Sequence, residues 1–489
     1  MNIATFIIAI TMVFALVMGL RAGRGRKIGL EGWSVGGRNF GPILVFILMA
    51  GEIYTTFTFL GASGYAYGKG APAYYTLVYL TFTYLLAYWM LPAIWRYARS
   101  EGILSQAGFF ARKYDSPALG LLVTCVGILA LIPYLVLQLK GLGIIVSTAS
   151  YGTLSPVLGA TLGAIVMSLY VFVSGIHGPA SIAIVKDVLI LAIVIFLGLY
   201  LPFHLYGGVG PMFHAIDVAH PGFLIFPAKG QSVSWFESTV LLTACGFFMW
   251  PHSFGSIYTA RDERSLRRNA VVSPLYGLML LFVLFVGFAA LMRVPGLTGK
   301  DIDLALFKIA LAELPPVVIG IIGAAGVLTA LVPGSMMLMA ASTTLAKDIY
   351  PLARRKTDER ETAIAAKVFV PIVAAVALYF TLNGGDTIVA LLLMGYSLVT
   401  QLLPSLLVSL GSRRVFSAEG AFAGICAGVA VVMFTTITKT SLATVAPGLP
   451  QWILDLNIGI VALALNVAAA LAVTAAVRAM QTRRVASVA

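Results

Sequence analysis

Residues 49–69 read M-A-G-E-I-Y-T-T-F-T-F-L-G-A-S-G-Y-A-Y-G-K, and they place one carboxylate, Glu52, in an otherwise apolar stretch. No other charged residue lies between Arg38 and Lys69. A membrane-spanning helix needs about 20 predominantly apolar residues, and residues 42–66 supply them. A carboxylate at the centre of such a helix costs about 2.5–3.5 kcal/mol to insert. The stretch therefore predicts a membrane helix with a functional acid; the alternative is a structural glutamate paired with a buried cation such as Lys186.

The whole chain has the composition of a membrane protein. Its 489 residues are 60% hydrophobic and 10% charged, whereas a soluble domain carries about 25% charged residues. We expect an all-α protein with about 13 spanning helices. The predicted spans are 2–21, 42–66, 73–95, 118–147, 156–175, 182–205, 236–258, 271–293, 313–344, 364–383, 387–410, 417–438 and 452–475.

The net charge of +13 does not indicate a nucleic-acid partner, because the basic residues gather on one side of the predicted helices. With the N-terminus outside, 24 of the 32 Lys and Arg residues lie on the cytoplasmic side and six on the outer side. The remaining two, Lys140 and Lys186, lie within predicted helices. This is the positive-inside bias. It predicts a multi-pass protein of the inner or plasma membrane, N-out and C-in, with the lipid bilayer as a partner.

Glycine and proline interrupt two of the predicted helices at matching positions. The second carries Gly51, Gly61 and Gly64, and the seventh carries Gly246, Pro251 and Gly255. The second helix would begin one group of five helices and the seventh would begin another, and the two groups would have opposite orientations in the membrane. Interrupted helices at matching positions of such inverted halves indicate a central binding site. The alternative is that these glycines only tighten helix packing. We find no nucleotide-binding loop of the G-x-x-x-x-G-K-[ST] type, which favours transport driven by an ion gradient.

The predicted division of the chain follows from these halves. It comprises 1–40 as an extra N-terminal helix and cytoplasmic loop, 41–206 as the first repeat, 207–235 as an outer loop, 236–411 as the second, inverted repeat, and 412–489 as two C-terminal helices with a short tail.

Three segments resemble a known family of transporters. W33-S-V-G-G-R-N-F-G41 is similar to the "GGR" signature of the sodium:solute symporter family. A340-A-S-T-T-L-A-K-D-I-Y350 resembles the family's Ser/Thr-rich run that closes on Asp, an aliphatic residue and Tyr. W250-P-H-S253 resembles a Q-P-H element of the proline-transporting members.

Two further segments narrow the resemblance. Residues 52–61 (EIYTTFTFLG) and 65–75 (YAYGKGAPAYY) look most like the bacterial monocarboxylate permeases. The resemblance covers about residues 30–480. It implies the LeuT-like fold of two inverted five-helix repeats, here with three extra helices, and alternating access around a site at the membrane midplane.

The resemblance also implies a sodium site, from which this sequence departs. Carbonyls of the second helix, here at Ala50 and Ile53 beside Glu52, would join two hydroxyls of the ninth helix. Counted back from D348-I-Y350, those hydroxyl positions are Val332 and Pro333, which have no side-chain oxygen. Hard cations take about six oxygen ligands, so this loss weakens the site. A shifted register would bring in Ser335 instead.

Lys186 and Asp187 offer a replacement, at a place where the family usually has a Thr-Asp pair. Proton-coupled relatives of the fold place a lysine ammonium where sodium would lie. Lys186 could do so with Asp187 or Glu52 as its counter-ion, and a desolvated Glu or Lys can exchange a proton near neutral pH. The alternative is that Lys186 snorkels to the cytoplasmic face. We expect proton coupling rather than sodium coupling.

Polar and aromatic residues in the interrupted helices and their neighbours are candidates for binding the solute. A helix N-terminus at a break favours an anionic group, and Lys140 could hold a carboxylate, or snorkel outward instead. The alternatives for the others are helix packing and hydrogen bonds between helices. The candidates are Tyr54, Thr55, Thr56, Gln138, Lys140, Trp250, His252, Tyr396 and Gln401.

The predicted function is secondary active transport without covalent chemistry. A small organic anion of the lactate, pyruvate or acetate type would cross together with H⁺ or Na⁺, with no other cofactor and no metal. A sodium-coupled symporter of an amino acid or other small organic solute, a channel and a non-transporting membrane sensor remain alternatives. No oligomeric state is predicted.

Overall fold

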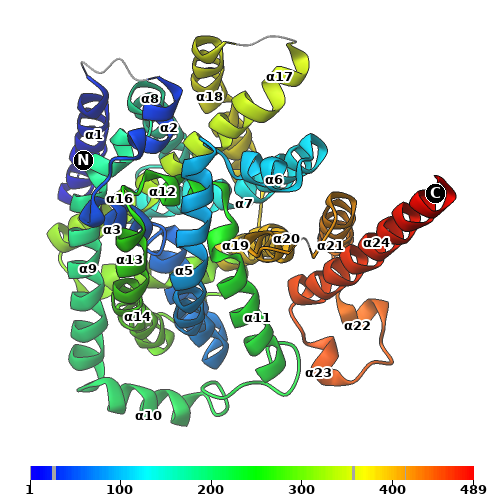
Figure 1. Cartoon of the computed structure of the whole chain (residues 1–489). Coiled ribbons are helices and arrows are strands. Elements are labelled where there is room, and N and C mark those ends of the chain that lie inside the picture. Colours follow the sequence, from blue (N-terminus) through cyan, green and yellow to red (C-terminus); the bar gives the residue numbers. More distant parts are fainter. Residues whose placement is uncertain (1, 25–28, 355–357, 414, 489) are drawn as a thin grey trace.

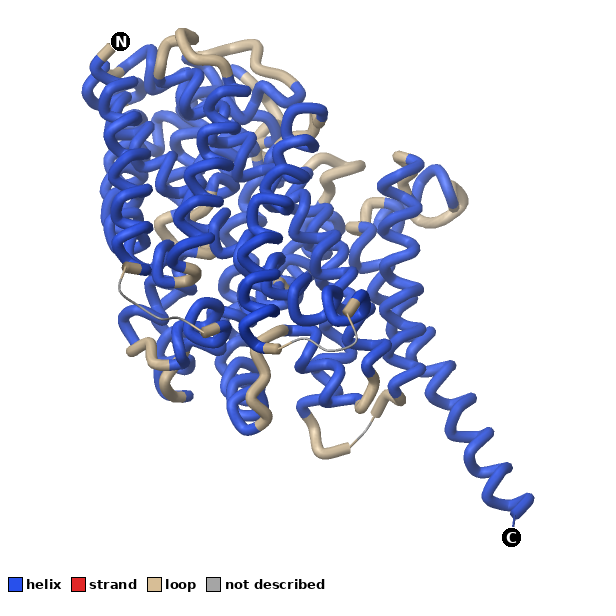
Figure 2. The backbone as a smooth tube through the Cα atoms, turned by 90° about the horizontal axis from the view of Figure 1, so that it is seen from above, coloured by secondary structure: helices blue, strands red, loops and turns tan. Residues whose placement is uncertain are grey.

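The computed structural model describes residues 2–24, 29–354, 358–413 and 415–488. These residues fold into helices with no strand among them, as Figures 1 and 2 show. The predicted all-α class is therefore confirmed. Five basic residues of the charge count, Arg26, Lys27, Arg355, Lys356 and Arg414, lie outside the described residues.

Among the described residues, eleven helices are long and apolar enough to cross a membrane. They are α1 (Ile3–Gly23), α5 (Tyr75–Ser100, entered through η3, Ala71–Tyr74), α7 (Pro117–Ala149), α8 (Pro156–Ser174), α9 (His177–Tyr206), α13 (Glu263–Gly277) with α14 (Leu280–Arg293), α16 (Pro316–Thr344) with η6 (Leu345–Ile349) and α17 (Tyr350–Ala353), α18 (Glu359–Asn383), α19 (Ile388–Val399) with η7 (Thr400–Leu402) and α20 (Leu403–Leu410), α21 (Ala418–Thr438), and α24 (Ile458–Val488).

The two helices with predicted interruptions are both broken. Helix α11 (Val233–Gly246) continues through η4 (Phe247–Met249) into α12 (Pro251–Thr259) with a bend of 55°, which gives a twelfth span if the pair is counted as one. The predicted span 42–66 consists of α3 (Pro42–Gly51), η2 (Phe57–Gly61) and α4 (Ala62–Lys69). None of these three pieces is long enough to cross a membrane alone, so the predicted number of thirteen spanning helices stays a prediction. The predicted orientation and the division of the chain into two repeats also stay predictions.

Local chemistry accounts for both breaks. After α3, the hydroxyl of Thr58 accepts the N–H of Thr55 at 2.8 Å, and the hydroxyl of Thr55 accepts the N–H of Phe57 at 3.1 Å. Threonine hydroxyls thus replace the helical carbonyls that these donors would otherwise use. In the second broken helix, Trp250 adopts an extended conformation, as the residue before Pro251 favours.

The start of α3 and the end of α12 are joined by their backbones. Phe40 and Ala260 form an isolated parallel bridge. The N–H of Phe40 donates to the carbonyl of Thr259 at 3.1 Å, and the N–H of Arg261 donates to the carbonyl of Phe40 at 3.2 Å. The two broken helices therefore contact each other at this end through main-chain hydrogen bonds.

Several connections that we predicted as loops or tail contain helices. These are α2 (Leu30–Val35) with η1 (Gly36–Arg38), α6 (Gln106–Tyr114), α10 (Val209–Ala219), η5 (Gly299–Leu304) with α15 (Ala305–Glu313), and α22 (Leu442–Val445), whereas α23 (Gln451–Leu454) lies at the start of the predicted span 452–475. Helix α10 lies across one end of the bundle in Figure 1 and buries Met212 and Ile216, four residues apart on one face. The expected C-terminal tail is instead a continuation of α24, which projects from the bundle in Figure 2.

Candidate functional site

Glu52 lies in the break after α3 and connects the two broken helices. Its side chain is buried, with the residue only 5% exposed. One carboxylate oxygen accepts a hydrogen bond from the hydroxyl of Ser253 at 2.7 Å, and the other accepts one from Ser256 at 2.6 Å. Both serines belong to α12. A buried carboxylate needs such partners, so the predicted functional acid faces the interior of the bundle.

Lys186 of α9 lies against the same break from another side. The side chain is fully buried, so the alternative that it snorkels to the surface is wrong. Its ammonium is 2.7 Å from the Asp187 carboxylate and 3.4 Å from the carbonyl oxygens of Gly51 and Tyr54. Lys186 thus places a positive charge at carbonyls that the break leaves accessible.

The carbonyls in this contact are one residue later than the ones we predicted. The carbonyl of Ala50 accepts the N–H of Ile53 at 2.9 Å within the turn that follows α3. Ile53 itself is buried in the core. Gly51 and Tyr54 therefore take the place that the sequence assigned to Ala50 and Ile53.

Helix α16 supplies no free hydroxyl to this region at the predicted positions. Val332 and Pro333 are buried in α16. The nearby Ser335 donates to the carbonyls of Leu331 and Val332 at 2.6 and 2.7 Å and also shares a hydrogen bond with the Tyr170 hydroxyl. If the alignment with the family were shifted so that Ser335 took the sodium-ligand position, its hydroxyl would already be engaged in these hydrogen bonds.

The predicted solute-binding residues Thr56, Gln138, Trp250, His252 and Tyr396 are brought together around the breaks. The side-chain oxygen of Gln138 accepts a hydrogen bond from the Thr56 hydroxyl at 2.6 Å. The ring of Trp250 is 6.0 Å from that of His252 and 5.3 Å from that of Tyr396.

Three polar atoms in this cluster have no hydrogen-bond partner within the part of the chain that the structure describes. They are Nε2 of Gln138, Nε1 of Trp250 and Nδ1 of His252, and all three are buried. An unpaired buried polar atom costs about 1–3 kcal/mol. A ligand with hydrogen-bonding groups would remove that cost.

Two further predicted solute-binding residues, Tyr54 and Thr55, form hydrogen bonds within the protein at the first break. The Tyr54 hydroxyl donates to the carbonyl of Tyr276 at 3.2 Å, and its own carbonyl faces Lys186. The Thr55 hydroxyl accepts the N–H of Phe57, as described for the break. Both residues therefore shape the broken segment and are already hydrogen-bonded.

Two of the predicted residues are not at this site. Lys140 donates to the Asp303 carboxylate and to the carbonyl of Asp386, both at 2.7 Å, so it is engaged in an ion pair. Gln401 donates to the carbonyl of Gly459 at 3.1 Å, and Asn466 of α24 donates to the carbonyl of Gln401 at 2.7 Å. Gln401 thus joins η7 to the C-terminal helix.

The sequence reasoning missed Ser253, Ser256 and Tyr134. The two serines lie three residues apart after Trp250-Pro251, a spacing that places both on one face of a helix. The Tyr134 ring is 4.7 Å from Trp250 and 5.6 Å from His252. Tyr134 directly follows Pro133 and lies one helical turn before Gln138. This position in the sequence could have identified it as a residue of the site.

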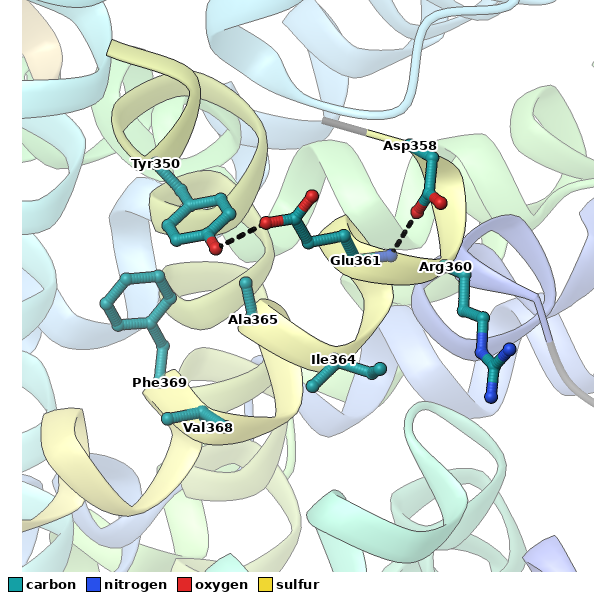
Figure 3. Close-up of a pocket in the computed structure, with 8 residues that line it drawn as sticks. All are labelled: Tyr350, Asp358, Arg360, Glu361, Ile364, Ala365, Val368 and Phe369. Carbon is teal, nitrogen blue, oxygen red and sulfur yellow. Dashed lines mark hydrogen bonds between the residues drawn. The ribbon is translucent and has the colours of Figure 1, made fainter. Parts of the chain in front are cut away.

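A surface hollow at another place is unrelated to this cluster. It has a volume of about 350 Å³ and lies where α17 and α18 meet. Figure 3 shows the Tyr350 hydroxyl donating to the Glu361 carboxylate there, at 2.8 Å. None of its lining residues belongs to the broken helices.

The model of the sodium:solute symporter family matches residues 33–428. This chain belongs to that family. It is 56% identical over 474 residues to the uncharacterized symporter YhjB of Bacillus subtilis, with 97% of each chain covered. It is 28% identical over 430 residues to a monocarboxylate transport permease protein of Rhizobium johnstonii, with 84% of each covered.

The fold is also that of a solved transporter structure. A Na⁺-coupled sialic acid symporter superposes with a TM-score of 0.79 at 15% identity, and 97% of each chain is covered. The predicted LeuT-like fold is confirmed. Family and fold are those of transporters, and the chain is a multi-pass membrane protein, consistent with the plasma membrane.

Proposed function

We propose that this symporter carries small monocarboxylates of the lactate, pyruvate or acetate type across the cell membrane together with protons. The observation that carries the proposal is the position of Lys186. Its ammonium lies at the carbonyls of Gly51 and Tyr54, where the family resemblance implies a sodium ion. A fixed positive charge at this place repels a second cation, and Val332 and Pro333 supply no side-chain oxygen to hold one.

Charge balance supports proton coupling. Lys186 and Asp187 neutralise each other at 2.7 Å, whereas Glu52 has two serine hydroxyls and no cation among its hydrogen-bond partners in the described chain. A proton on Glu52 would remove the remaining buried charge, as favourable burial requires. Glu52 is therefore the residue that we assign to proton uptake.

The position of Glu52 gives that proton a mechanical role. The carboxylate bridges the break after α3 to α12, one broken helix in each proposed repeat. Protonation neutralises the carboxylate that accepts hydrogen bonds from Ser253 and Ser256. Both hydrogen bonds become weaker, because hydrogen bonds to a charged acceptor are the stronger kind. A proton thus changes the relative stability of the two arrangements of the broken helices, as coupled transport requires.

The aromatic cluster suits a small anion with a short apolar body. Nε2 of Gln138 is an unpaired donor, and the rings of Tyr134, Trp250 and Tyr396 pack against one another and offer apolar surface. The relative named as a monocarboxylate transport permease supports a carboxylate as the recognised group.

The test uses the purified chain in proteoliposomes. Uptake of labelled lactate is measured with an imposed pH gradient or an imposed sodium gradient, and a panel of small acids and amino acids competes with the label. We expect accumulation against the lactate gradient when the outside is acidic, and no requirement for sodium. Uptake that requires sodium and ignores pH would refute proton coupling. Equilibration without accumulation would identify a channel, and absence of flux for the whole panel would favour a sensor.

A variant separates the role of Lys186 from a general effect of lost charge. Lys186→Gln should abolish proton-driven accumulation, whereas Lys308→Gln, a change in α15 away from the breaks, should leave it unchanged. Wild-type accumulation by Lys186→Gln would remove this residue from the coupling mechanism.

A further inference from the structure

A pocket of about 390 Å³ lies where three parts of the chain meet, away from the broken helices. Its walls come from the end of α6, the connection between α20 and α21, and the C-terminal part of α24. Figure 1 shows α20, α21 and α24 together at one side of the molecule. We call it the basic pocket, after Lys113, Arg413 and Arg478, which line it.

The three basic residues come from distant parts of the sequence. Lys113 belongs to α6, Arg413 follows the end of α20, and Arg478 belongs to α24. All three lie in segments that the positive-inside pattern assigns to the cytoplasmic side. The fold therefore gathers positive charges of three separate segments around one pocket at the predicted cytoplasmic end of the helices.

Two of these side chains are held at the pocket wall by contacts within the protein. The Lys113 ammonium lies 4.1 Å from the centroid of the Tyr97 ring, which is a cation–π geometry. Nη2 of Arg478 donates to the carbonyl of Val415 at 3.0 Å. Arg413 is exposed, and in the described part of the chain no hydrogen bond or ion pair engages its guanidinium.

The acids of the pocket leave an excess of positive charge. Asp115 and Glu419 also line it, so three basic side chains face two acidic ones. Both acids are exposed, and in the described part of the chain neither forms an ion pair with Lys113 or Arg413. The N-terminus of α21, at Ala418, lies at the same wall and adds the positive end of a helix dipole. The pocket therefore favours an anion.

Apolar side chains continue from the pocket toward the interior of the membrane. Leu407 lies one helical turn before Gly411, and Phe422 lies one turn after Ala418, and both Gly411 and Ala418 line the pocket. Leu407 is 42% exposed and Phe422 is 39% exposed. One turn corresponds to about 6 Å along the helix. A basic pocket with exposed apolar surface just below it matches the headgroup and acyl chains of a phospholipid.

From this geometry we infer that the basic pocket binds the phosphate of an anionic phospholipid in the predicted cytoplasmic leaflet. Lys113 and Arg413 pair with the phosphate oxygens, and the acyl chains lie along Leu407 and Phe422. Guanidinium groups match phosphate geometry, and basic pockets between membrane helices on this side bind anionic headgroups. The bound lipid joins α6 to the C-terminal helices. This inference is independent of the transported solute and of the coupling ion.

Native mass spectrometry of the purified chain in detergent measures the binding. Dioleoyl phosphatidylglycerol is titrated, and dioleoyl phosphatidylcholine, which has the same acyl chains and no net charge, is the control lipid. We expect the anionic lipid to bind at least tenfold more tightly. Equal affinities for the two lipids would refute the inference.

Variants locate the binding at the basic pocket. Arg413→Gln should weaken binding of phosphatidylglycerol about fivefold, the effect of one basic residue at an anionic membrane surface, and Arg413→Lys should retain most of the affinity. Arg264→Gln, which removes an exposed basic residue of α13 on the same predicted side, should leave the affinity unchanged. An equal loss in both glutamine variants would mean that the lipid binds to the basic surface in general and would overturn the pocket.

Thermal unfolding distinguishes a lipid from a soluble phosphate. Phosphatidylglycerol added to the detergent should raise the unfolding temperature by several degrees, and Arg413→Gln should lose most of this rise. Inorganic phosphate and glycerol phosphate at millimolar concentration should have no such effect. A rise of the same size with either soluble anion would assign the pocket to a free phosphate compound and refute the lipid.

A photoreactive lipid tests the position directly in the wild-type chain. The probe is a phosphatidylglycerol with a diazirine on the acyl chain close to the headgroup. Peptides that contain Leu407 or Phe422 should be labelled, and the labelling should fall in Arg413→Gln but not in Arg264→Gln. Labelling confined to other helices would refute the site, even for a protein that binds the lipid.

Discussion

Lys140 and Asp303 form an ion pair of 2.7 Å that joins α7 to η5. The Asp303 carboxylate also accepts the N–H of Ile388 at the start of α19, at 3.0 Å. Next to it, the carbonyl of Ile302 lies so close to Gly64 of α4 that a Cβ there would approach it to 2.5 Å. One buried acid therefore joins α7, η5 and α19 next to α4, the last part of the first broken helix.

Removing one member of this pair should destabilise the protein strongly. Asp303→Asn leaves the partly exposed Lys140 ammonium without its counter-ion, and loss of a hydrogen bond to a charged group costs about 1.5–3 kcal/mol. Lys140→Met combined with Asp303→Leu should cost less than the sum of the single changes. Thermal unfolding in detergent measures these effects, with Lys300→Gln as the control. Additive losses would show that the two side chains do not interact energetically.

Glu52→Gln should eliminate gradient-driven uptake and leave exchange of solute across the membrane intact. The amide still bridges to Ser253 and Ser256 but takes up no proton. We expect accumulation of labelled lactate to fall at least tenfold, while counterflow in vesicles preloaded with unlabelled lactate continues. Glu237→Gln, a change at an exposed position of α11, is the matched control. Wild-type accumulation in Glu52→Gln would exclude this residue from coupling.

Gly141 allows α7 to approach the broken segment. A Cβ at this position would overlap Cγ2 of Thr56, so Gly141→Ala should displace Thr56 from Gln138. Overpacking of this kind costs about 1–3 kcal/mol, and we expect a lower unfolding temperature and little uptake. Thr56→Ser removes the clashing methyl group and keeps the hydroxyl.

The double variant Gly141→Ala/Thr56→Ser should therefore recover part of both properties, because the Cβ and the hydroxyl oxygen of residue 56 stay at 2.9 and 3.1 Å from the added Cβ. Thr56→Ser alone should remain active. Failure of the serine to rescue would mean that the contact with Cγ2, the closest at 1.7 Å, is not what disables Gly141→Ala.

Asp262 stabilises the start of α13 in a pH-dependent manner. Its carboxylate accepts hydrogen bonds from the hydroxyl and the N–H of Ser265, at 2.7 and 2.8 Å. These bonds, the hydroxyl first, lower the pKa of the Asp262 carboxyl below its ordinary value. Because the folded state has the lower pKa, the stabilisation is present above the ordinary pKa of aspartate and is lost as the pH falls through the lowered value.

Asp262→Ala should cost about 1 kcal/mol at neutral pH, as loss of an N-cap does. The difference in unfolding temperature between the two proteins should shrink as the pH is lowered toward 3. Asp217→Ala, at an exposed position of α10, should show no such trend. A gap that stays constant with pH would mean that the alanine acts through packing rather than through the cap.

Features set by local sequence were the predictable part of this protein. The apolar runs place the helices, and Gly51 and Pro251 mark the two breaks because glycine and an X-Pro pair disfavour a continuous helix at those points. The acid in the first stretch made Glu52 a candidate, because a charge in an apolar helix needs either a buried partner or a function. Each of these properties is carried by a few neighbouring residues.

Pairings between distant residues were the part that sequence could not supply. Lys140 finds Asp303 and Gln401 finds Asn466, and neither partner is marked by its spacing. An isolated polar residue in a helix is equally compatible with a solute, a lipid interface or another helix. Only the packing of α7 against η5, and of η7 against α24, decides among them.

The backbone bridge between Phe40 and Ala260 limits how far the two broken helices can separate at this end of the bundle. Main-chain hydrogen bonds join the start of one to the end of the other, and the Glu52 carboxylate joins them a second time through Ser253 and Ser256. Any movement that parts the two helices at this end must therefore break these hydrogen bonds; otherwise the two helices move together.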